Sequence, residues 1–506
     1  MNKNNIVTSA ALVTLMMLLF KIIGFVKQAV IAYYFGASVN TDIYFIAYGF
    51  IGGVSEIIIK SVSVSIISVY SFTLINSGKD KADQLISAVM EVMMPIGLLI
   101  VGLLCIFSPV IVKMIAPSYT SNESVLLDKY IHILSPLLLF AAIELVFGAV
   151  MDANKSFFLP RLQSLIYSVT IICACVFLSD WLSVSTLAIG EYVSRVLFSI
   201  LLFITIRKYW SFNFVHLKSI PQLKKIVLTA IPLFVGNGVF QLNEIVDKAI
   251  ASGLDTGTAS ALTYCHTLEQ FVTNIMIVNI GNVIFAHFAD YVSKQELAQI
   301  SSILKTAINA IICILVPISI ITIVCAEDIV AIVYYRGNFS IDALKLTSIA
   351  LIGYAISFPA IGVRDLTVKS LYAFGDTTRP MRASIISIIC NICLSILLSR
   401  FLGIFGISLA TSISALIGMI LNAYSLKIYL PSYSYKNHIF TLLRILPGTI
   451  ILLILSLYIT RLNFTNSSMT SFICTCIAGG SVYLLAICFS GIDEIRDLIN
   501  YILHKK

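Results

Sequence analysis

The residues of most chemical interest are charged side chains inside long hydrophobic stretches. An ionisable group within a membrane span costs roughly 2.5–3.5 kcal/mol on insertion scales, so it normally faces protein or a water-filled cavity. Lys21 and Lys27 lie in the first stretch, with no opposite charge one helical turn away. Arg364 lies near the middle of another stretch, about 13 Å from its expected end. Such cations suit an anionic cargo, above all a diphosphate that several donors hold together.

Other charges in hydrophobic stretches have a partner of opposite sign four residues away. Residues at this spacing share one face of a helix, where they neutralise each other or line a cavity together. The pairs are Glu56 with Lys60, Glu191 with Arg195, and Asp365 with Lys369. Lys60 is therefore a further cavity candidate, beside the simpler interpretation that it only pairs locally.

The first stretch poses a geometric question about its two lysines. A straight helix would direct Lys21 and Lys27 about 120° apart around its axis. Gly24 lies between them and permits a bend that brings both toward a cavity. Snorkelling to the cytosolic interface does not suit Lys27, because it lies far from the first loop.

The elements that must position these residues are predicted to be membrane-spanning helices. Of the 506 residues, 59% are hydrophobic and 11% charged, and the mean hydropathy is +0.98. A soluble domain carries about 25% charged residues, and the apolar runs are long enough to cross a hydrocarbon core of about 30 Å. We expect an all-α polytopic membrane protein with about fourteen transmembrane helices, near residues 8–34, 41–74, 84–115, 127–151, 158–178, 184–207, 224–252, 258–291, 301–326, 341–373, 380–400, 404–427, 438–460 and 468–490.

The positive charges indicate orientation rather than nucleic-acid binding. The net charge of +8 is spread over short loops and forms no single patch. Most basic loops fall on one side of the predicted spans, which places both termini in the cytoplasm and implies an even number of spans. The longest loop, about 207–224, lacks Asp and Glu. A membrane enzyme with catalytic carboxylates there is therefore not expected.

The chain also matches itself at a constant offset of 220 residues. Pro160 and Pro380 open equivalent helices after similar loops, and Cys173 matches Cys393. The repeat predicts a six-helix lobe over residues 1–215, a second over 216–430, an extra helix pair over 431–490 and a cytosolic tail over 491–506. Because each unit holds an even number of helices, the two copies run in the same direction through the membrane, as in transporters with parallel repeats.

Four segments give the chain its resemblance to a known family. They are KIIGFVKQAVIAYYFGASVNTDIYFIAY at 21–48, QLNEIVDKAIASGLDTGTASALTY at 241–264, YYRGNFS at 334–340 and LYAFGDTTRP at 371–380. With them the sequence resembles the MurJ/MviN family of lipid II flippases, over about residues 8–490. The resemblance implies two lobes around a cationic cavity for the diphosphate and sugar, with a groove beside the last two helices for the polyprenyl tail.

The resemblance also assigns individual residues. Lys21 and Lys27 occupy positions of family arginines, and Asp42 matches an aspartate that opens the second helix. Three family positions differ: the second-helix arginine falls near Ser55, and an arginine and a glutamate of the eighth helix fall at Thr267 and Gln270. His266 and Glu269 lie nearby as possible sugar contacts, although a packed, hydrogen-bonded His266 is the alternative.

A cation site is implied as well, because some relatives are thought to bind sodium in the second lobe. Asp247, Asn391 and Thr411 are the oxygen ligands that this chain offers. No cofactor is expected beyond a coupling ion, either Na⁺ or H⁺.

The function implied is alternating-access transport of an undecaprenyl-diphosphate-linked glycan, foremost lipid II, across the bacterial cytoplasmic membrane. The differences at Ser55 and Thr267 leave three alternatives: a flippase for capsular or exopolysaccharide repeat units, an ion-coupled small-molecule exporter, and a scaffold that does not transport. The expected partners are the lipid-linked substrate and membrane lipid. The oligomeric state is left open.

Overall fold

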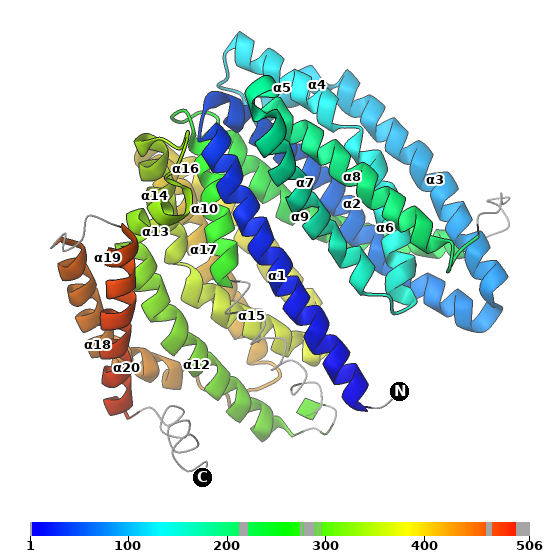
Figure 1. The fold of residues 1–506 in the computed structure, drawn as a ribbon. Helices are drawn as coiled ribbons and strands as arrows, with labels where there is room; N and C mark the ends of the chain where they lie inside the picture. The colour runs from blue at the N-terminus through cyan, green and yellow to red at the C-terminus, as the bar shows by residue number, and fades with distance from the viewer. Residues whose placement is uncertain are drawn as a thin grey trace. The chain divides into compact units, whose positions relative to one another are not determined.

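The computed structural model describes residues 3–211, 221–273, 277, 288, 291–292, 294, 296–461 and 468–491. Within these residues the regular secondary structure is entirely helical, as predicted. Internal contacts divide the chain into two compact units, Met1–Ser260 with Gly337–Phe339, and Ala261–Arg336 with Ser340–Lys506. Each is described separately, and Figure 1 labels their helices.

The first unit is built around one long helix, α2. The elements of this unit are α1 (Lys3–Phe35), α2 (Val39–Ser77), α3 (Lys79–Ile106), α4 (Ser108–Ile115), α5 (Ser121–Leu134), α6 (Leu137–Ala153), α7 (Phe158–Leu182), α8 (Ser185–Ile206), α9 (Pro221–Ala251) and the first residues of α10 (Thr258–Thr273). Helix α2 packs against α9, α6 and α5, while α7 packs against α8 and α1.

The second unit contains the rest of α10 and the later helices. These are α12 (Leu297–Val324), α13 (Ala326–Tyr334), α14 (Ile341–Ala355), α15 (Phe358–Ala373), α16 (Thr378–Leu402), α17 (Ile404–Leu426), α18 (Lys436–Arg461), α19 (Ser468–Cys474), the π-helical turn η3 (Thr475–Gly479) and α20 (Gly480–Phe489). Helix α17 packs against α14, α15 and α16, and α18 packs against α12 and α20.

Local sequence signals explain where several helices start. Ser38 and Thr41 form a capping box at α2, with the Ser38 N–H donating to Thr41 Oγ1 at 2.6 Å. Thr120 and Glu123 form a second capping box at α5, in which the Thr120 N–H donates to Glu123 Oε2 at 2.8 Å. Between α1 and α2, Gly36 has φ +59°, a left-handed conformation that favours glycine. These residues fix the positions at which the chain turns back into the next helix.

The number of spans is only partly tested by the described residues. Among them, eleven helices are long and apolar enough to cross a membrane, and twelve if α14 and α15, bent by 45°, form one span. These twelve correspond to predicted spans. The other two predictions fall at 8–34, which α1 covers, and at 258–291, whose later part lies outside the described residues. Fourteen spans therefore remain a prediction.

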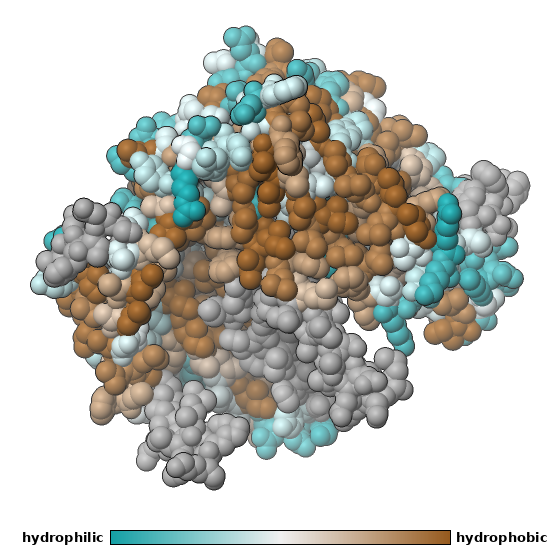
Figure 2. Space-filling view, in the orientation of Figure 1, coloured by the Kyte–Doolittle hydropathy of each residue, from teal (hydrophilic) through white to brown (hydrophobic). Residues whose placement is uncertain are grey.

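The surface agrees with a membrane location. On the face seen in Figure 2, hydrophobic side chains cover a broad central area, and hydrophilic side chains gather at the top and at the lower right. Many large apolar side chains are exposed on the helices, among them Phe177, Trp181 and Phe401. This chain is a multi-pass membrane protein, because such surfaces would be unstable in water.

The helix bounds show the same offset that the sequence repeat has. Helices α7 and α16 begin 220 residues apart and end 220 residues apart. The compact units follow contacts instead, and α9 belongs to the first because it packs along α2, where Asn237 Nδ2 donates to Ser61 Oγ at 3.1 Å. The lobe limits at 215 and 430 remain a prediction, and the predicted tail beyond Gly491 lies outside the described residues.

Candidate functional site

Lys27 lies at the contact between α1 and α7 in the first unit. Its ammonium nitrogen is 4.2 Å from the centroid of the Tyr167 ring, the geometry of a cation–π contact. A Cβ on Gly24 would be 3.7 Å from Ser168 Oγ, so a small residue lets α1 approach α7 here. Within the described part of the chain, the Lys27 side chain forms no hydrogen bond and no ion pair. It is therefore a cation held by an aromatic face, with no carboxylate in direct contact.

Lys21 has different surroundings from Lys27. Helix α1 continues through Gly24 without a break, and the Lys21 side chain is exposed, whereas Lys27 is half-buried. The six-residue spacing directs the two side chains to different sides of a continuous helix. The structure does not bring them together by a break at Gly24, and the cavity role of Lys21 stays a prediction.

A buried charge cluster lies close to Lys27 and differs from the predicted pairing. Arg195 forms its ion pair with Glu144 of α6, and Gln163 Nε2 of α7 donates to the same carboxylate at 2.6 Å. Glu191 and Arg195 form no direct ion pair among the described residues, because Glu144 provides a nearer carboxylate from the neighbouring helix, although the two charges still attract each other. Glu144 was missed, although it too is an ionisable residue inside a predicted span.

Glu191 is left in an unusual position by this arrangement. Its side chain is fully buried, and neither carboxylate oxygen has a hydrogen-bond partner within the described residues. The side chains of Tyr48 and Tyr167 lie close enough to stabilise its charge, and Arg195 and Lys27 both attract it electrostatically. A buried carboxylate is costly without such compensation, and Arg195 provides more of it than Lys27 does.

The predicted pair of Glu56 and Lys60 is confirmed on α2. The two side chains form an ion pair, and Gln241 Nε2 of α9 donates to Glu56 at 2.6 Å. Ser55, at a position where the family has an arginine, is buried in the same helix. Lys60 is therefore neutralised locally, and its predicted part in a cavity remains untested.

The Asp42 carboxylate accepts hydrogen bonds from the backbone at the start of α10 and caps that helix. The carboxylate accepts from the N–H of Gly257 at 2.6 Å and from the N–H of Ser260 at 2.7 Å. The Ser260 hydroxyl donates to it as well, at 2.5 Å. These bonds satisfy donors at the start of α10, which have no partner inside their own helix. The structure thus gives Asp42 a stabilising role, and its cavity role stays a prediction.

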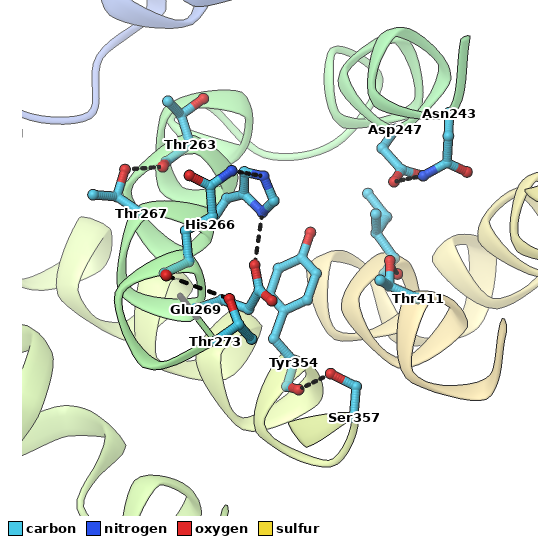
Figure 3. A network of polar contacts seen from close by, with 12 residues as sticks. Asn243, Asp247, Thr263, His266, Thr267, Glu269, Thr273, Tyr354, Ser357 and Thr411 are labelled. Atoms are coloured by element: carbon cyan, nitrogen blue, oxygen red, sulfur yellow. Dashed lines mark hydrogen bonds and ion pairs between the residues drawn. The ribbon is translucent and has the colours of Figure 1, made fainter. Parts of the chain in front are cut away.

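His266, Glu269 and Gln270 form one network on α10, and Figure 3 labels His266 and Glu269. His266 Nδ1 is 3.2 Å from Glu269 Oε2, and His266 Nε2 is 2.9 Å from Gln270 Nε2. Because the amide nitrogen donates to Nε2, the ring carries its proton on Nδ1 and donates it to Glu269. Thr267 instead bonds to the Thr263 carbonyl at 3.0 Å. The hydrogen-bonded alternative for His266 is therefore realised, which leaves sugar contact as a prediction.

Arg364 extends along α17 in the second unit. A Cβ on Gly418 would be 3.2 Å from Arg364 Cδ, so a glycine makes room for the arginine. The neighbouring pair Asp365 and Lys369 is confirmed at 2.7 Å. Among the described residues the Arg364 side chain has no ion pair and no hydrogen bond, while the Arg364 carbonyl accepts from Thr367 Oγ1 at 2.9 Å. Like Lys27, it is a cation inside a predicted span that forms no ion pair.

The residues predicted to hold a cation lie on three helices. Asp247 on α9 accepts from Asn243 at 3.4 Å, Asn391 on α16 accepts from Ser395 at 3.3 Å, and Thr411 on α17 donates to Ile407 at 3.3 Å. Asp247 belongs to the first unit and the other two to the second. Their oxygens have the hard-ligand chemistry that a small cation needs, and the cation site remains a prediction.

Comparison with known proteins decides the family. A family model described as "Lipid II flippase MurJ" matches residues 31–474, most of the chain. This chain belongs to the MurJ family. The MurJ relative from Thermosipho africanus, named "Lipid II flippase MurJ", is 26% identical over 505 residues, covering 99% of each chain. A "Probable lipid II flippase MurJ" from Rickettsia prowazekii is 25% identical over 423 residues, covering 83% of this chain and 82% of the relative.

Solved structures agree with the MurJ fold. A structure titled "Lipid II flippase MurJ, inward closed conformation" matches with a TM-score of 0.83 and 24% identity, covering 97% of this chain and all of the other. An inward-facing MATE family multidrug transporter of the MOP superfamily matches at 0.68 with 11% identity, covering 82% and 95%. The fold of this MurJ family member is therefore that of a polytopic transporter bundle.

Proposed function

We propose that this protein moves lipid II, an undecaprenyl-diphosphate-linked glycan precursor, across the bacterial cytoplasmic membrane. Membership in the MurJ family over most of the chain supports this. The structural observation that carries the proposal is the presence of two span cations, Lys27 and Arg364, that form no ion pair among the described residues. Each can give its charge to a diphosphate without first breaking an ion pair.

The remaining features of the mechanism belong to the same proposal. The protein acts by alternating access between its lobes and without catalysing a reaction. Both termini lie in the cytoplasm, following the distribution of basic loops. Na⁺ at Asp247, Asn391 and Thr411, or H⁺, serves as the coupling ion. The lipid-linked glycan and membrane lipid are the partners.

The test is complementation in a bacterium whose own lipid II flippase is repressed. Wild-type chain is expected to restore growth and to expose labelled lipid II to an enzyme added outside spheroplasts. Without the chain, lipid II should accumulate in protected form on the cytosolic side. If the chain reaches the membrane and lipid II stays protected, the proposal is wrong.

A second candidate cargo is another polyprenyl-linked glycan, such as a capsular or exopolysaccharide repeat unit. The observation favouring it is that Ser55, Thr267 and Gln270 replace charged family residues, so polar contacts to the sugar differ. Depletion in the native cell separates the two, because the intermediate that accumulates identifies the cargo. An ion-coupled small-molecule exporter would instead leave both lipid intermediates at normal levels.

A further inference from the structure

A groove between three helices of the first unit is not used by the proposed transport mechanism. It has a volume of about 810 Å³ and lies between α3, α6 and α8, whose labels can be followed in Figure 1. This volume is within the roughly 300–1,000 Å³ of typical ligand sites. The groove is therefore large enough for a molecule and is not merely a packing defect.

The lining of the groove is apolar for most of its length. Phe147 of α6 forms a buried floor, while Ile200 and Phe203 of α8 form a wall that is about half exposed. All three helices belong to candidate membrane spans. In a membrane, half-exposed apolar side chains on such spans would meet hydrocarbon, so we expect lipid rather than water to fill the groove.

One end of the groove is polar and rigidly built. Arg207 follows the last residue of α8, and its guanidinium carbon is 5.0 Å from the Phe203 ring centroid. Trp210 Nε1 donates to the Asp83 carbonyl at 3.0 Å, and the Ser211 hydroxyl donates to the Asp83 carboxylate at 2.9 Å. These bonds fasten the segment after α8 to α3. Among the described residues that line the groove, Arg207 alone is charged.

The length of the groove restricts what fits. From Arg207 to Val196, the farthest lining residue on α8, eleven residues of helix span about 16 Å. This is about half of a hydrocarbon core of roughly 30 Å, the depth of one leaflet. An acyl chain has this reach when its headgroup lies at the interface, whereas a long polyprenyl tail exceeds it.

We propose that this groove binds one acyl chain of an anionic glycerophospholipid, with the headgroup phosphate on Arg207. Basic residues at the cytosolic ends of transmembrane helices are suited to anionic headgroups. The adjacent Phe203 holds the guanidinium over the chain entrance, where it can donate two hydrogen bonds to phosphate. The site is separate from Lys27 and Arg364 and does not depend on the identity of the cargo.

The test uses the full-length protein in lipid nanodiscs with phosphatidylglycerol that carries a photoreactive group at the end of one acyl chain. After illumination, mass spectrometry should locate the label on peptides of α6 and α8 near Phe140 and Val196. Unlabelled phosphatidylglycerol should compete, and phosphatidylcholine should compete weakly. Arg207→Gln should reduce labelling about five-fold, the effect of roughly 1 kcal/mol for one interfacial charge, while Arg207→Lys retains most of it.

Two further variants make the result decisive. Lys208→Gln removes the neighbouring exposed cation, which does not line the groove, and should leave labelling unchanged. Ile200→Trp fills the groove and should abolish labelling although Arg207 is intact. The proposal is overturned if Lys208→Gln acts like Arg207→Gln, if phosphatidylcholine competes equally, if Ile200→Trp has no effect, or if a polyprenyl phosphate displaces the label better than phosphatidylglycerol does.

Discussion

Asp42 and Ser260 are joined by two hydrogen bonds, one from the Ser260 N–H at 2.7 Å and one from its hydroxyl at 2.5 Å. With a third bond from the Gly257 N–H, the Asp42 carboxylate satisfies the start of α10 from the first turn of α2. Hydrogen bonds to a buried charged acceptor contribute more than neutral ones. A single side chain thus fixes the chain between two segments that are far apart in the sequence.

Replacing Asp42 by alanine is expected to destabilise the protein by about 2–3 kcal/mol, because three buried donors lose their acceptor. The thermal midpoint in detergent, followed by fluorescence-detected size exclusion, should fall by several degrees. Asp180→Asn changes an exposed carboxylate and should leave the midpoint within a degree. An unchanged midpoint for Asp42→Ala would contradict the capping role.

The separation in sequence between a charged residue and its partner explains which contacts could be predicted from the sequence and which could not. Span positions follow from hydropathy, and the Glu56–Lys60 pair follows from helix geometry, since the residues are four apart. Arg195 finds its carboxylate 51 residues away, on Glu144. Asp42 finds its donor 218 residues away. Such contacts depend on which helices pack together, and residue spacing along one helix carries no information about that.

The two buried glutamates of the first unit give a matched pair for mutagenesis. Glu144→Gln would leave the Arg195 guanidinium without its ion-pair partner, and breaking a buried pair typically costs about 3–5 kcal/mol. Glu191→Gln removes a carboxylate that forms no ion pair within the described residues, although Arg195 and Lys27 attract its charge. Its loss of stability should therefore be smaller than that of Glu144→Gln.

Thermal unfolding of both variants in the same detergent measures the difference. Charge alone does not explain the expected order, because both changes remove one negative charge from a buried position. Equal losses of stability in the two variants would show that Glu191 stabilises Arg195 as strongly as Glu144 does, which would contradict the larger role given to the Glu144 ion pair.

Asp376, in the loop before α16, predicts a pH dependence of stability. Partial burial acts to raise the pKa of this carboxyl, but bonds from the Arg379 N–H and guanidinium and from the Tyr429 hydroxyl lower the pKa overall. A lowered folded-state pKa stabilises the protein above about pH 3.9, the ordinary value, and this contribution is lost as pH falls through the folded-state pKa.

Asp376→Asn should therefore have a lower thermal midpoint than wild type at pH 7, and the gap should close as the pH falls from about 5 to about 3. Arg379→Gln removes one of the groups that lower the pKa of Asp376, so its gap to wild type should close over the same range. A gap that stays constant with pH would mean that Asp376 acts through packing and not through its charge.

Lys27 provides the most direct test of transport, because its ammonium contacts the Tyr167 ring and no carboxylate among the described residues. Lys27→Ala should abolish complementation of a flippase-depleted strain while the protein still reaches the membrane in normal amount. Lys27→Arg keeps the charge and the contact with the ring, so it should retain function. Tyr167→Phe keeps the aromatic face and should be tolerated, whereas Tyr167→Ala frees the ammonium and should reduce transport.

Lys345→Ala, at an exposed lysine of α14, is the control and should complement fully. Full complementation by Lys27→Ala would remove Lys27 from the substrate path and leave Arg364 as the remaining cation to test.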